Sequence, residues 1–305
     1  MEPIVLTHGG AGAPASAKDG ADAAAHRGLE EGDALAMALA ATCVLEDDPR
    51  FNAGTGANYR LDGETIELDA SVMTSDGRSG AVACLERVQH PILVAARVRE
   101  RTPHLLIAGG GATAFARRQG FPDYDPGTKE RRSHLERARA LLLQRRFAEP
   151  GFEAWQILAE RDEVKALWNF STDYPGDTVG AVTRDESGAF AATASTGGTL
   201  FTLRGRVGDS PLIGCGVFAG PRGAVACTGA GEEIVRRFLA KTVYDALARG
   251  NGARATIDAA LAEIPAAIPM GILAVTSTEH AHGCNREMPV GVAARPKVAP
   301  APRRG

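Results

Sequence analysis

The sequence predicts a layered α/β protein. Short apolar runs bounded by glycine or polar residues, which are typical of buried strands, occur in both halves of the 305-residue chain. Segments of helical composition lie between and after them, and this order favours a layered α/β sandwich over a series of parallel βαβ units. Only 5% of the residues are aromatic, so close packing of small side chains must supply much of the core.

The first half of the chain alternates strands and helices. Three brief apolar runs predict strands at Ile4–Thr7, Gly80–Leu85 and His104–Ala108. Helical composition predicts helices at Ala34–Leu45, Ile92–Arg101 and Glu130–Phe147, the last with many charges and with leucines grouped towards one side.

The composition changes at Thr178. The segment before it, Phe170–Asp177 (FSTDYPGD), is rich in turn-forming residues and has no periodicity. Strand-like runs follow in succession: TVGAVTRD, AFAATAST, SPLIGCGVFA and AVACTG. We then expect helices at Glu232–Arg249 and Ala253–Ile264, a strand at Gly271–Ser277, and a disordered Pro- and Arg-rich tail over roughly 295–305.

Charge and hydropathy narrow the class of partner. Lys plus Arg (34) minus Asp plus Glu (37) gives −3, and no basic face stands out, so a nucleic-acid or anionic-membrane partner has no electrostatic support. The start of the chain has no basic region followed by a long apolar run, and no apolar stretch is long enough to span a bilayer. We therefore expect a cytoplasmic protein that acts on a small molecule or a peptide.

The cysteines and histidines do not suggest a metal centre. The five cysteines are widely spaced without a C-x-x-C pair, which argues against a disulfide framework and against a zinc site, and favours reduced core thiols. His8, in HGGAG, precedes a glycine bend and is not expected to act as a base. The remaining histidines are isolated along the sequence, so we expect solvent or core roles for them.

The dipeptide Asp177-Thr178 has the context of a latent nucleophile. A threonine hydroxyl reacts poorly unless a base adjoins it, and one solution is to make the threonine N-terminal so that its own α-amine accepts the proton. That amine titrates near about 7.7 to 8.0. The chain would have to cut itself, with Thr178 attacking the carbonyl of Asp177 and water hydrolysing the resulting ester. Gly176 supplies the backbone freedom that a strained turn needs. The same pattern also occurs as a simple turn before a strand.

Seven motifs decide between these alternatives. In chain order they are HGGAG (His8–Gly12), LEDDPRFNAGTG (Leu45–Gly56), LDASVM (Leu68–Met73), GDTVGAV (Gly176–Val182), STGG (Ser195–Gly198), GRVGDSPLIGCGVFA (Gly205–Ala219) and CTGAGE (Cys227–Glu232). In this order the sequence resembles the plant-type asparaginase and isoaspartyl peptidase group of threonine-dependent N-terminal nucleophile hydrolases. The resemblance implies a four-layer αββα sandwich, cleaved into an α subunit (1–177) and a β subunit (178–305).

The resemblance also implies roles for individual residues. Thr178 matches the nucleophile, and Thr196 matches the second threonine that positions it. Arg206 and Asp209 match the pair that binds the substrate's α-carboxylate and α-ammonium groups. Their motif brings two further substrate-binding candidates, Val207 and Gly208.

The CTGAGE motif matches the oxyanion hole of the family. There the Thr228 hydroxyl and the Gly229 backbone N–H face the oxygen that becomes negative in the tetrahedral intermediate. Thr228 and Gly229 are also candidates for substrate binding, together with Ala230 and Gly231. The helix expected from Glu232 would begin beside them and favour negative charge there.

The resemblance also implies a bound ion, and this sequence differs from the family in several places. Asn52 lies in the Leu45–Thr55 loop, which in this family backs the nucleophile and holds a structural sodium ion through backbone carbonyls. We expect no other cofactor. The family commonly has a lysine near the position of Thr202, the helical region after HGGAG looks shortened, and the end of the chain is less aromatic. These differences concern substrate preference more than the reaction.

The function implied is hydrolysis of β-aspartyl dipeptides and of the side-chain amide of L-asparagine, by a dimer of cleaved protomers. Two alternatives stay open. One is a glycosylasparaginase, which is disfavoured because that group is usually exported or lysosomal. The other is an unprocessed binding protein that keeps the fold without the chemistry.

Overall fold

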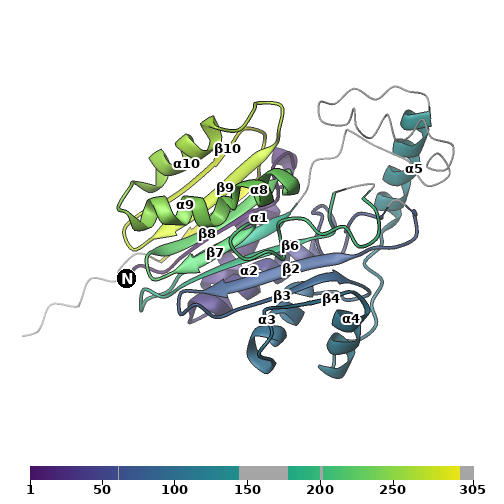
Figure 1. Cartoon of the computed structure of the whole chain (residues 1–305), viewed down its shortest axis with the longest axis horizontal. Coiled ribbons are helices and arrows are strands. Elements are labelled where there is room, and N and C mark those ends of the chain that lie inside the picture. The colour runs from purple at the N-terminus through teal and green to yellow at the C-terminus, as the bar shows by residue number, and fades with distance from the viewer. Residues whose placement is uncertain (61, 144–177, 200–201, 296–305) are drawn as a thin grey trace, which may run out of the picture.

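Two β-sheets organise the chain, and helices pack against both of them (Figure 1). The computed structural model describes residues 1–60, 62–143, 178–199 and 202–295, with the backbone alone for 138–143. The strands are β1 (Ile4–His8), β2 (Leu68–Thr74), β3 (Ser79–Leu85), β4 (Leu106–Ala108), β5 (Val179–Arg184), β6 (Phe190–Thr196), β7 (Val217–Gly220), β8 (Gly223–Gly229), β9 (Met270–Thr276), β10 (His280–Cys284) and β11 (Val290–Ala294). The helices are a 3-10 turn η1 (Ala15–Ala17) and α1 (Lys18–Leu29), α2 (Ala34–Asp47), α3 (Pro91–Arg101), α4 (Gly109–Arg118), α5 (Lys129–Leu143), α8 (Gly231–Arg237), α9 (Leu239–Ala248) and α10 (Ala253–Ala262).

The larger sheet has seven strands in the order β11-β1-β5-β6-β2-β3-β4. Its neighbours pair antiparallel except β3 and β4, and this confirms that the chain is not a parallel βαβ series. Helices α1 to α4 pack against it. The smaller sheet, β10-β9-β8-β7, is antiparallel throughout and packs against α9 and α10.

The two sheets contact each other through a core of small and branched side chains. Strands β5 and β6 of the larger sheet touch β8 of the smaller one. Leu6, Val182 and Ala194 from one sheet share a buried cluster with Ala226 and Leu273 from the other. Small residues such as alanine let the two backbones approach closely, as the low aromatic content predicts.

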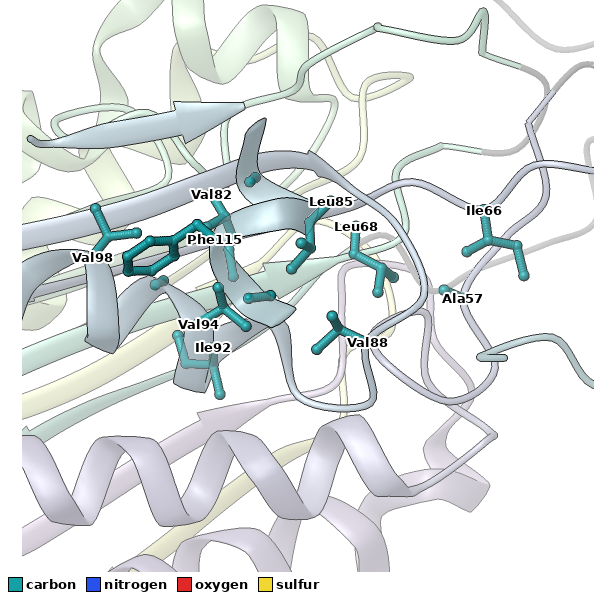
Figure 2. Packing of buried hydrophobic residues seen from close by; sticks show 14 of the residues in the cluster. Ala57, Ile66, Leu68, Val82, Leu85, Val88, Ile92, Val94, Val98 and Phe115 are labelled. Atoms are coloured by element: carbon teal, nitrogen blue, oxygen red, sulfur yellow. The ribbon is translucent and has the colours of Figure 1, made fainter. Parts of the chain in front are cut away.

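A second cluster lies on the side of the larger sheet that faces α3 and α4. Val82 and Leu85 of β3 pack with Ile92 and Val98 of α3 and Phe115 of α4 (Figure 2). All five side chains are buried. The spacing of six residues between Ile92 and Val98, with Ala95 midway, puts the apolar side of α3 on the sheet.

Most predicted elements are confirmed to within a few residues, but two are wrong. The run 210–219 is not one strand: Ser210–Gly216 forms turns, and only β7 at its end is extended. Pro211 has no N–H for a ladder, and Gly214 adopts a positive φ of 91°, which favours a turn. The predicted helix Glu232–Arg249 is two helices, because Phe238 adopts a left-handed conformation (φ 46°, ψ 48°) between α8 and α9.

Several elements were not foreseen. Helix α4 and strands β2, β10 and β11 have weak local signals, because alanine, glycine or alternating polar residues make up much of them, whereas α1 lies in the helical region expected after HGGAG. The predicted disordered tail, except for residue 295, lies outside the described residues. So do the whole turn-rich segment Phe170–Asp177 and the end of the predicted Glu130–Phe147 helix. All five cysteines are free thiols, three of them buried and Cys43 and Cys284 half-buried. Every helix in the described ranges is too short or too polar to cross a bilayer.

A fully buried arginine ties the loops at one end of the larger sheet together. The Arg60 Nε lies 3.0 Å from Glu67 Oε2, and both side chains are almost inaccessible to solvent. Arg60 Nη1 also donates to the Thr202 hydroxyl at 2.6 Å. Thr202 stands near the position where the resembled family commonly has a lysine, so here an arginine from another segment supplies positive charge to that region.

We expect Arg60→Met to lower the free energy of unfolding by about 3 to 5 kcal/mol, because it leaves the buried Glu67 carboxylate without its cation. Arg204→Met is the matched control: it removes an ion pair of similar length, 2.9 Å to Glu86, that is exposed on both sides, and should cost only about 0 to 1 kcal/mol. Urea unfolding of both variants measures the difference. Equal losses would show that burial of the Arg60 pair does not matter.

Candidate functional site

Thr178 lies where the two sheets meet. It precedes β5, which runs between β1 and β6 in the larger sheet. Its hydroxyl lies 3.2 Å from that of Ser210, and its carbonyl oxygen accepts a hydrogen bond from the Thr228 hydroxyl of β8 at 3.3 Å. The residue is only 3% exposed. A buried hydroxyl held between two sheets has few accessible positions, as a positioned nucleophile requires.

A narrow cavity opens at Thr178. Its lining comes from residues far apart in the sequence, namely Thr178, Thr196, Gly198, Thr199, Arg206, Gly208, Asp209, Ser210, Gly229 and Gly231. The cavity volume is about 10 Å³, room for roughly one water molecule. A larger ligand therefore has to displace side chains at the cavity before it reaches the Thr178 hydroxyl.

The structure thus brings together most of the residues that the motifs nominated. Thr178, Thr196, Arg206 and Asp209 line one cavity with three of the predicted glycines. Thr228 contacts the site through the Thr178 carbonyl. Like Thr228, the candidates Val207 and Ala230 do not line the cavity. Ala230 instead precedes α8, with its N–H bonded to the Pro269 carbonyl.

Thr196 is held at the end of β6 by a loop that the Asn52 side chain braces. The Thr196 hydroxyl accepts a hydrogen bond from the Gly198 N–H at 2.9 Å. The side-chain Nδ2 of Asn52 donates to the Gly198 carbonyl at 2.8 Å. The backbone carbonyl of Asn52 accepts from the Gly197 N–H at 3.0 Å. A Cβ on Gly197 would lie 2.5 Å from the Ala57 Cβ, so only glycine fits there. Asn52 therefore fixes the loop that follows Thr196.

Arg206 is mostly buried and engaged by one carboxylate. Its Nε and Nη2 donate to the two carboxylate oxygens of Glu232 at 2.9 and 2.7 Å. The Glu232 side chain is 57% exposed, so this partner lies on the solvent side of the guanidinium. The fork geometry of this pair is the one in which a guanidinium binds any carboxylate.

Asp209 is a buried carboxyl whose charge is only partly compensated. It is 3% exposed, and its Oδ2 has no hydrogen-bond partner among the described residues. Burial raises the pKa of Asp209 to about 7, and nearby Arg206 only partly opposes this shift. Asp69, on β2, is a second such group: burial raises its pKa to about 6 while its Oδ1 accepts from the Cys84 N–H. A cationic ligand beside Asp209 would relieve the cost of its ionisation.

Two glycines let the backbone at the end of β8 and at the start of α8 lie close to the residues of the site. Gly229 ends β8 with a φ of 128°, and a Cβ there would lie 2.2 Å from the Pro269 carbonyl oxygen. A Cβ on Gly231 would lie 2.9 Å from Arg206 Nη2 and 3.0 Å from Asp209 Oδ1. Larger residues at these two positions would therefore disturb the backbone or the two charged side chains.

Sequence reasoning gave no role to several contributors, among them Gly198 and Thr199 of the cavity lining. Ser210 follows Asp209 in GRVGDS, and its position as the hydroxyl next to a nominated residue was the available signal. Ala11, in HGGAG, donates its N–H to the Thr228 hydroxyl at 3.3 Å. Asp69 belongs to LDASVM, a motif that gave no role to its carboxyl. His8 is fully buried, and burial lowers its pKa to about 4, so its imidazole is neutral near pH 7; that it does not act as a base stays a prediction.

A family model described as Asparaginase matches residues 1–296 of the chain. The chain belongs to the asparaginase family. It is 42% identical over 241 residues to the plant-type L-asparaginase of Pyrococcus furiosus. The aligned region covers 77% of this chain and 73% of that protein. The isoaspartyl peptidase of Salmonella typhimurium is 40% identical over 253 residues, 78% and 76% of the two chains. The human isoaspartyl peptidase/L-asparaginase is 34% identical over 275 residues, 86% and 82% of the two chains.

The carbonyls of the 45–55 loop fit the sodium ion that the asparaginase family implies. The Glu46 and Gln89 carbonyl oxygens both lie 2.6 Å from where a Cβ on Gly54 would stand, and the φ of Gly54 is 50°. Converging carbonyl oxygens are ligands that a hard cation prefers. Glu46 would offer such an ion its carbonyl oxygen, which also accepts from the Thr55 N–H at 2.8 Å, and Gln89 would add one from outside the loop; the ion would contribute to the shape of the loop.

A larger cavity elsewhere in this asparaginase-family chain does not compete as the active site. It has a volume of about 240 Å³ and is lined by Arg254, His280, Ala281, His282 and Val292. That lining offers no hydroxyl, thiol or carboxylate group. The small cavity at Thr178 is lined by hydroxyl groups, a guanidinium and a carboxyl group, most of which the motifs nominated.

The raised pKa of Asp209 predicts a pH-dependent stability. Between its ordinary value near 3.8 and about 7, the folded chain holds a proton that the unfolded chain has released. The free energy of unfolding should therefore fall as the pH rises through this window, by about 2 to 3 kcal/mol between pH 5 and pH 8. Asp209→Asn should remove that part of the fall, as measured by urea unfolding at fixed protein concentration.

The control is Asp123→Asn, whose carboxyl is exposed and paired with Arg87. This variant should keep the wild-type fall. A wild-type pH slope in Asp209→Asn would mean that the folded protein does not hold a proton on Asp209.

Proposed function

We propose that the chain is an autoprocessed threonine hydrolase that cleaves β-aspartyl dipeptides and hydrolyses L-asparagine to L-aspartate and ammonia. The observation that carries this proposal is the cavity that joins the Thr178 hydroxyl to a buried guanidinium and a buried carboxyl, those of Arg206 and Asp209. The names of the relatives, plant-type L-asparaginase and isoaspartyl peptidase, agree with it. The reaction is acyl transfer to a threonine hydroxyl and then to water.

Maturation comes first, because Thr178 is internal in the translated chain. Its hydroxyl attacks the carbonyl carbon of Asp177, the peptide C–N bond breaks as the Thr178 nitrogen takes a proton, and an ester joins the two residues. Water then hydrolyses the ester and leaves a free α-amine on Thr178. The products are the α subunit, 1–177, and the β subunit, 178–305. Asp177 itself lies outside the described residues.

Catalysis then uses the amine and the hydroxyl of the same residue. The Thr178 α-amine accepts the hydroxyl proton as the oxygen attacks the substrate's β-carbonyl. The Thr228 hydroxyl and the Gly229 N–H stabilise the oxyanion of the tetrahedral intermediate. The amine returns the proton to the leaving nitrogen, and water hydrolyses the aspartyl ester by the same sequence of steps. Thr196 and Ser210 position the Thr178 side chain.

Recognition depends on the two charged groups in the cavity. Arg206 pairs with the substrate α-carboxylate, which takes a place at the guanidinium beside or instead of Glu232. Asp209 pairs with the α-ammonium group, and that cation favours the ionised form of a carboxyl whose pKa burial has raised to about 7. Both substrates present the same aspartyl unit, so only the leaving amine differs.

The architecture that fits this function is a four-layer αββα sandwich whose cleaved protomers form a dimer, an (αβ)₂ heterotetramer. The sandwich is supported by the buried cluster that the two sheets share and the helices that pack against each sheet, whereas the dimer is implied by the family resemblance alone. A glycosylasparaginase would use the same nucleophile on a bulkier substrate, but the relatives named above are L-asparaginases and isoaspartyl peptidases. An unprocessed binding protein would have no need of a buried Thr178 hydroxyl beside Ser210 and Thr228.

Self-cleavage should yield two chains. Apportioning 31.8 kDa by length gives about 18.5 kDa for residues 1–177 and about 13.3 kDa for residues 178–305. Intact mass of the purified protein measures this outcome. Thr178→Ala should stay a single full-length chain, whereas Thr183→Ala, a strand threonine in the same segment, should still be cut. Cleavage of Thr178→Ala after Asp177 would contradict the mechanism.

The charged pair should make the enzyme select the β-linkage. In β-Asp-Leu both the α-carboxylate and the α-ammonium group are free, whereas in α-Asp-Leu the α-carboxylate is consumed by the peptide bond. Sites built to pair a polar group reject analogues that lack it by up to about 10⁴-fold or more. Release of free leucine by the processed protein should therefore be confined to β-Asp-Leu.

Arg206→Lys is the variant that tests the origin of this selectivity. It should still self-process but lose about 2 to 5 kcal/mol of transition-state stabilisation with β-Asp-Leu, because lysine cannot form the bidentate pair. Exposed Arg204→Lys is the control and should keep wild-type kcat/KM. Comparable rates on both isomers would rule out the assigned roles of Arg206 and Asp209.

A further inference from the structure

Three potential metal ligands meet at the junction of α2 and α3, and none of them lines the cavity at Thr178. The Cys43 Sγ, a Glu46 carboxylate oxygen and a His90 ring nitrogen all lie within 4.8 Å of one another. Cys43 and Glu46 are three residues apart on α2 and therefore share one side of that helix. His90 directly precedes α3, which packs against α2. The sequence separates these residues, so cysteine spacing alone gave no sign of the cluster.

Glu46 points a fully buried, unsatisfied oxygen into this cluster. Its Oε1 accepts hydrogen bonds from the Ser195 hydroxyl at 2.6 Å and from the Ile92 N–H at 3.0 Å. Its Oε2 has no hydrogen-bond partner among the described residues, although the side chain is 0% exposed. An oxygen left in this state costs free energy unless a cation or a donor compensates it.

His90 presents the matching nitrogen. Its Nδ1 lies 3.3 Å from Glu46 Oε2 and likewise makes no hydrogen bond within the part of the chain that the structure describes. Its Nε2 lies 3.5 Å from Asp47 Oδ1, an oxygen that also accepts from Gln89 Nε2 at 2.7 Å. The Asp47 carboxylate beside Nε2 favours the tautomer of His90 that carries its proton on Nε2. Nδ1 is then free to bind a metal.

We propose that Cys43 Sγ, Glu46 Oε2 and His90 Nδ1 bind a zinc ion, with water as the fourth ligand. One sulfur, one imidazole nitrogen and one carboxylate oxygen form a donor set typical of zinc, which accepts all three atom types in tetrahedral geometry. Asp47, which accepts a hydrogen bond from Gln89, lies beside Nε2 of His90 and orients the ring without binding the metal. This ion would be distinct from the sodium ion that the family implies for the 45–55 loop, because its ligands are side chains and not backbone carbonyls.

Zinc would change the protonation state of the cluster. Burial raises the pKa of the Cys43 thiol well above its ordinary value, so without metal the sulfur keeps its proton. Binding replaces the S–H bond by an S–Zn bond and releases one proton to solvent. The alternative without metal is an ion pair between Glu46 and His90. Burial lowers the pKa of His90, but the nearby Glu46 carboxylate raises it, and the pKa lies above its ordinary value.

The proposed site would connect three segments near the active site. The C-terminal turn of α2 carries Cys43 and Glu46, His90 precedes α3, and Glu46 bonds Ser195, the neighbour of Thr196 on β6. Zinc would therefore act on stability and on the placement of these segments, without contact with the Thr178 cavity. The inference does not depend on the proposed hydrolase activity.

The test is metal binding by the purified, untagged protein after chelator treatment, in sodium-containing buffer. We expect one equivalent of zinc per chain, and one equivalent of Co²⁺ with an absorption band from thiolate-to-cobalt charge transfer. Cys43→Ser should lose that band and bind zinc at least about 100-fold more weakly. Cys284→Ser, which removes another half-buried thiol, is the matched control and should behave as wild type. Added zinc should raise the melting temperature of the wild type and of this control, but not of Cys43→Ser.

His90→Gln is the second variant and should also weaken zinc binding, in case Cys43→Ser does not fold. The cobalt spectrum of the wild type needs no variant at all. The absence of stoichiometric binding in the wild type would overturn the proposal and leave the Glu46–His90 ion pair. Equal zinc affinity in Cys43→Ser and Cys284→Ser would overturn it too, because the metal would then lie elsewhere.

Discussion

The close approach of the two sheets at Thr178 is the constraint on which the rest of the structure depends. β5 is buried between β1 and β6, and its preceding residue is tied to β8 by the hydrogen bond between the Thr228 hydroxyl and the Thr178 carbonyl. Small residues allow this approach. A Cβ on Gly180 would lie 2.6 Å from both His8 Nε2 and the Thr193 carbonyl oxygen. Glycine is therefore required two residues after the candidate nucleophile.

The same closeness explains the electrostatics of the site. Asp69, Arg206 and Asp209 are brought into an interior where ionisation is costly, and burial raises the pKa of each carboxyl. Such an arrangement lowers stability in the absence of a ligand and is favourable only when a ligand supplies compensating charges. We regard the unsatisfied Asp209 oxygen as part of a binding site for that reason. The buried Arg60–Glu67 pair, by contrast, is internally compensated and serves the fold.

The sequence was most informative where local pattern and chemistry coincide. β5, β6 and β8 were predictable because each is a short apolar run between turn residues, and the motifs around Thr178, Thr196 and Thr228 lie at their ends. The family was correctly identified from the seven motifs and their order along the chain. The roles of the individual site residues stay predictions until they are tested in solution.

The rest depended on tertiary contacts that no local pattern encodes. The break at Phe238 arises in a stretch with helical propensity on both sides. Strands β10 and β11 are half-exposed, so they lack an apolar run, and their partners lie on β9 and β1. Ser210 reaches Thr178 across 32 residues, and His90 reaches Glu46 across 44, so only the folded chain reveals either pair.

The central claim is that Thr178 is the nucleophile, and covalent labelling tests it most directly. An L-asparagine analogue whose side-chain amide is replaced by a diazoketone should enter the cavity and alkylate the attacking group. After digestion with trypsin, mass spectrometry of the processed protein should find one adduct, on Thr178 in the peptide Thr178–Arg184, growing in step with the loss of activity. A label on Thr196, Ser210 or Thr228, or complete inactivation with Thr178 unlabelled, would contradict the account.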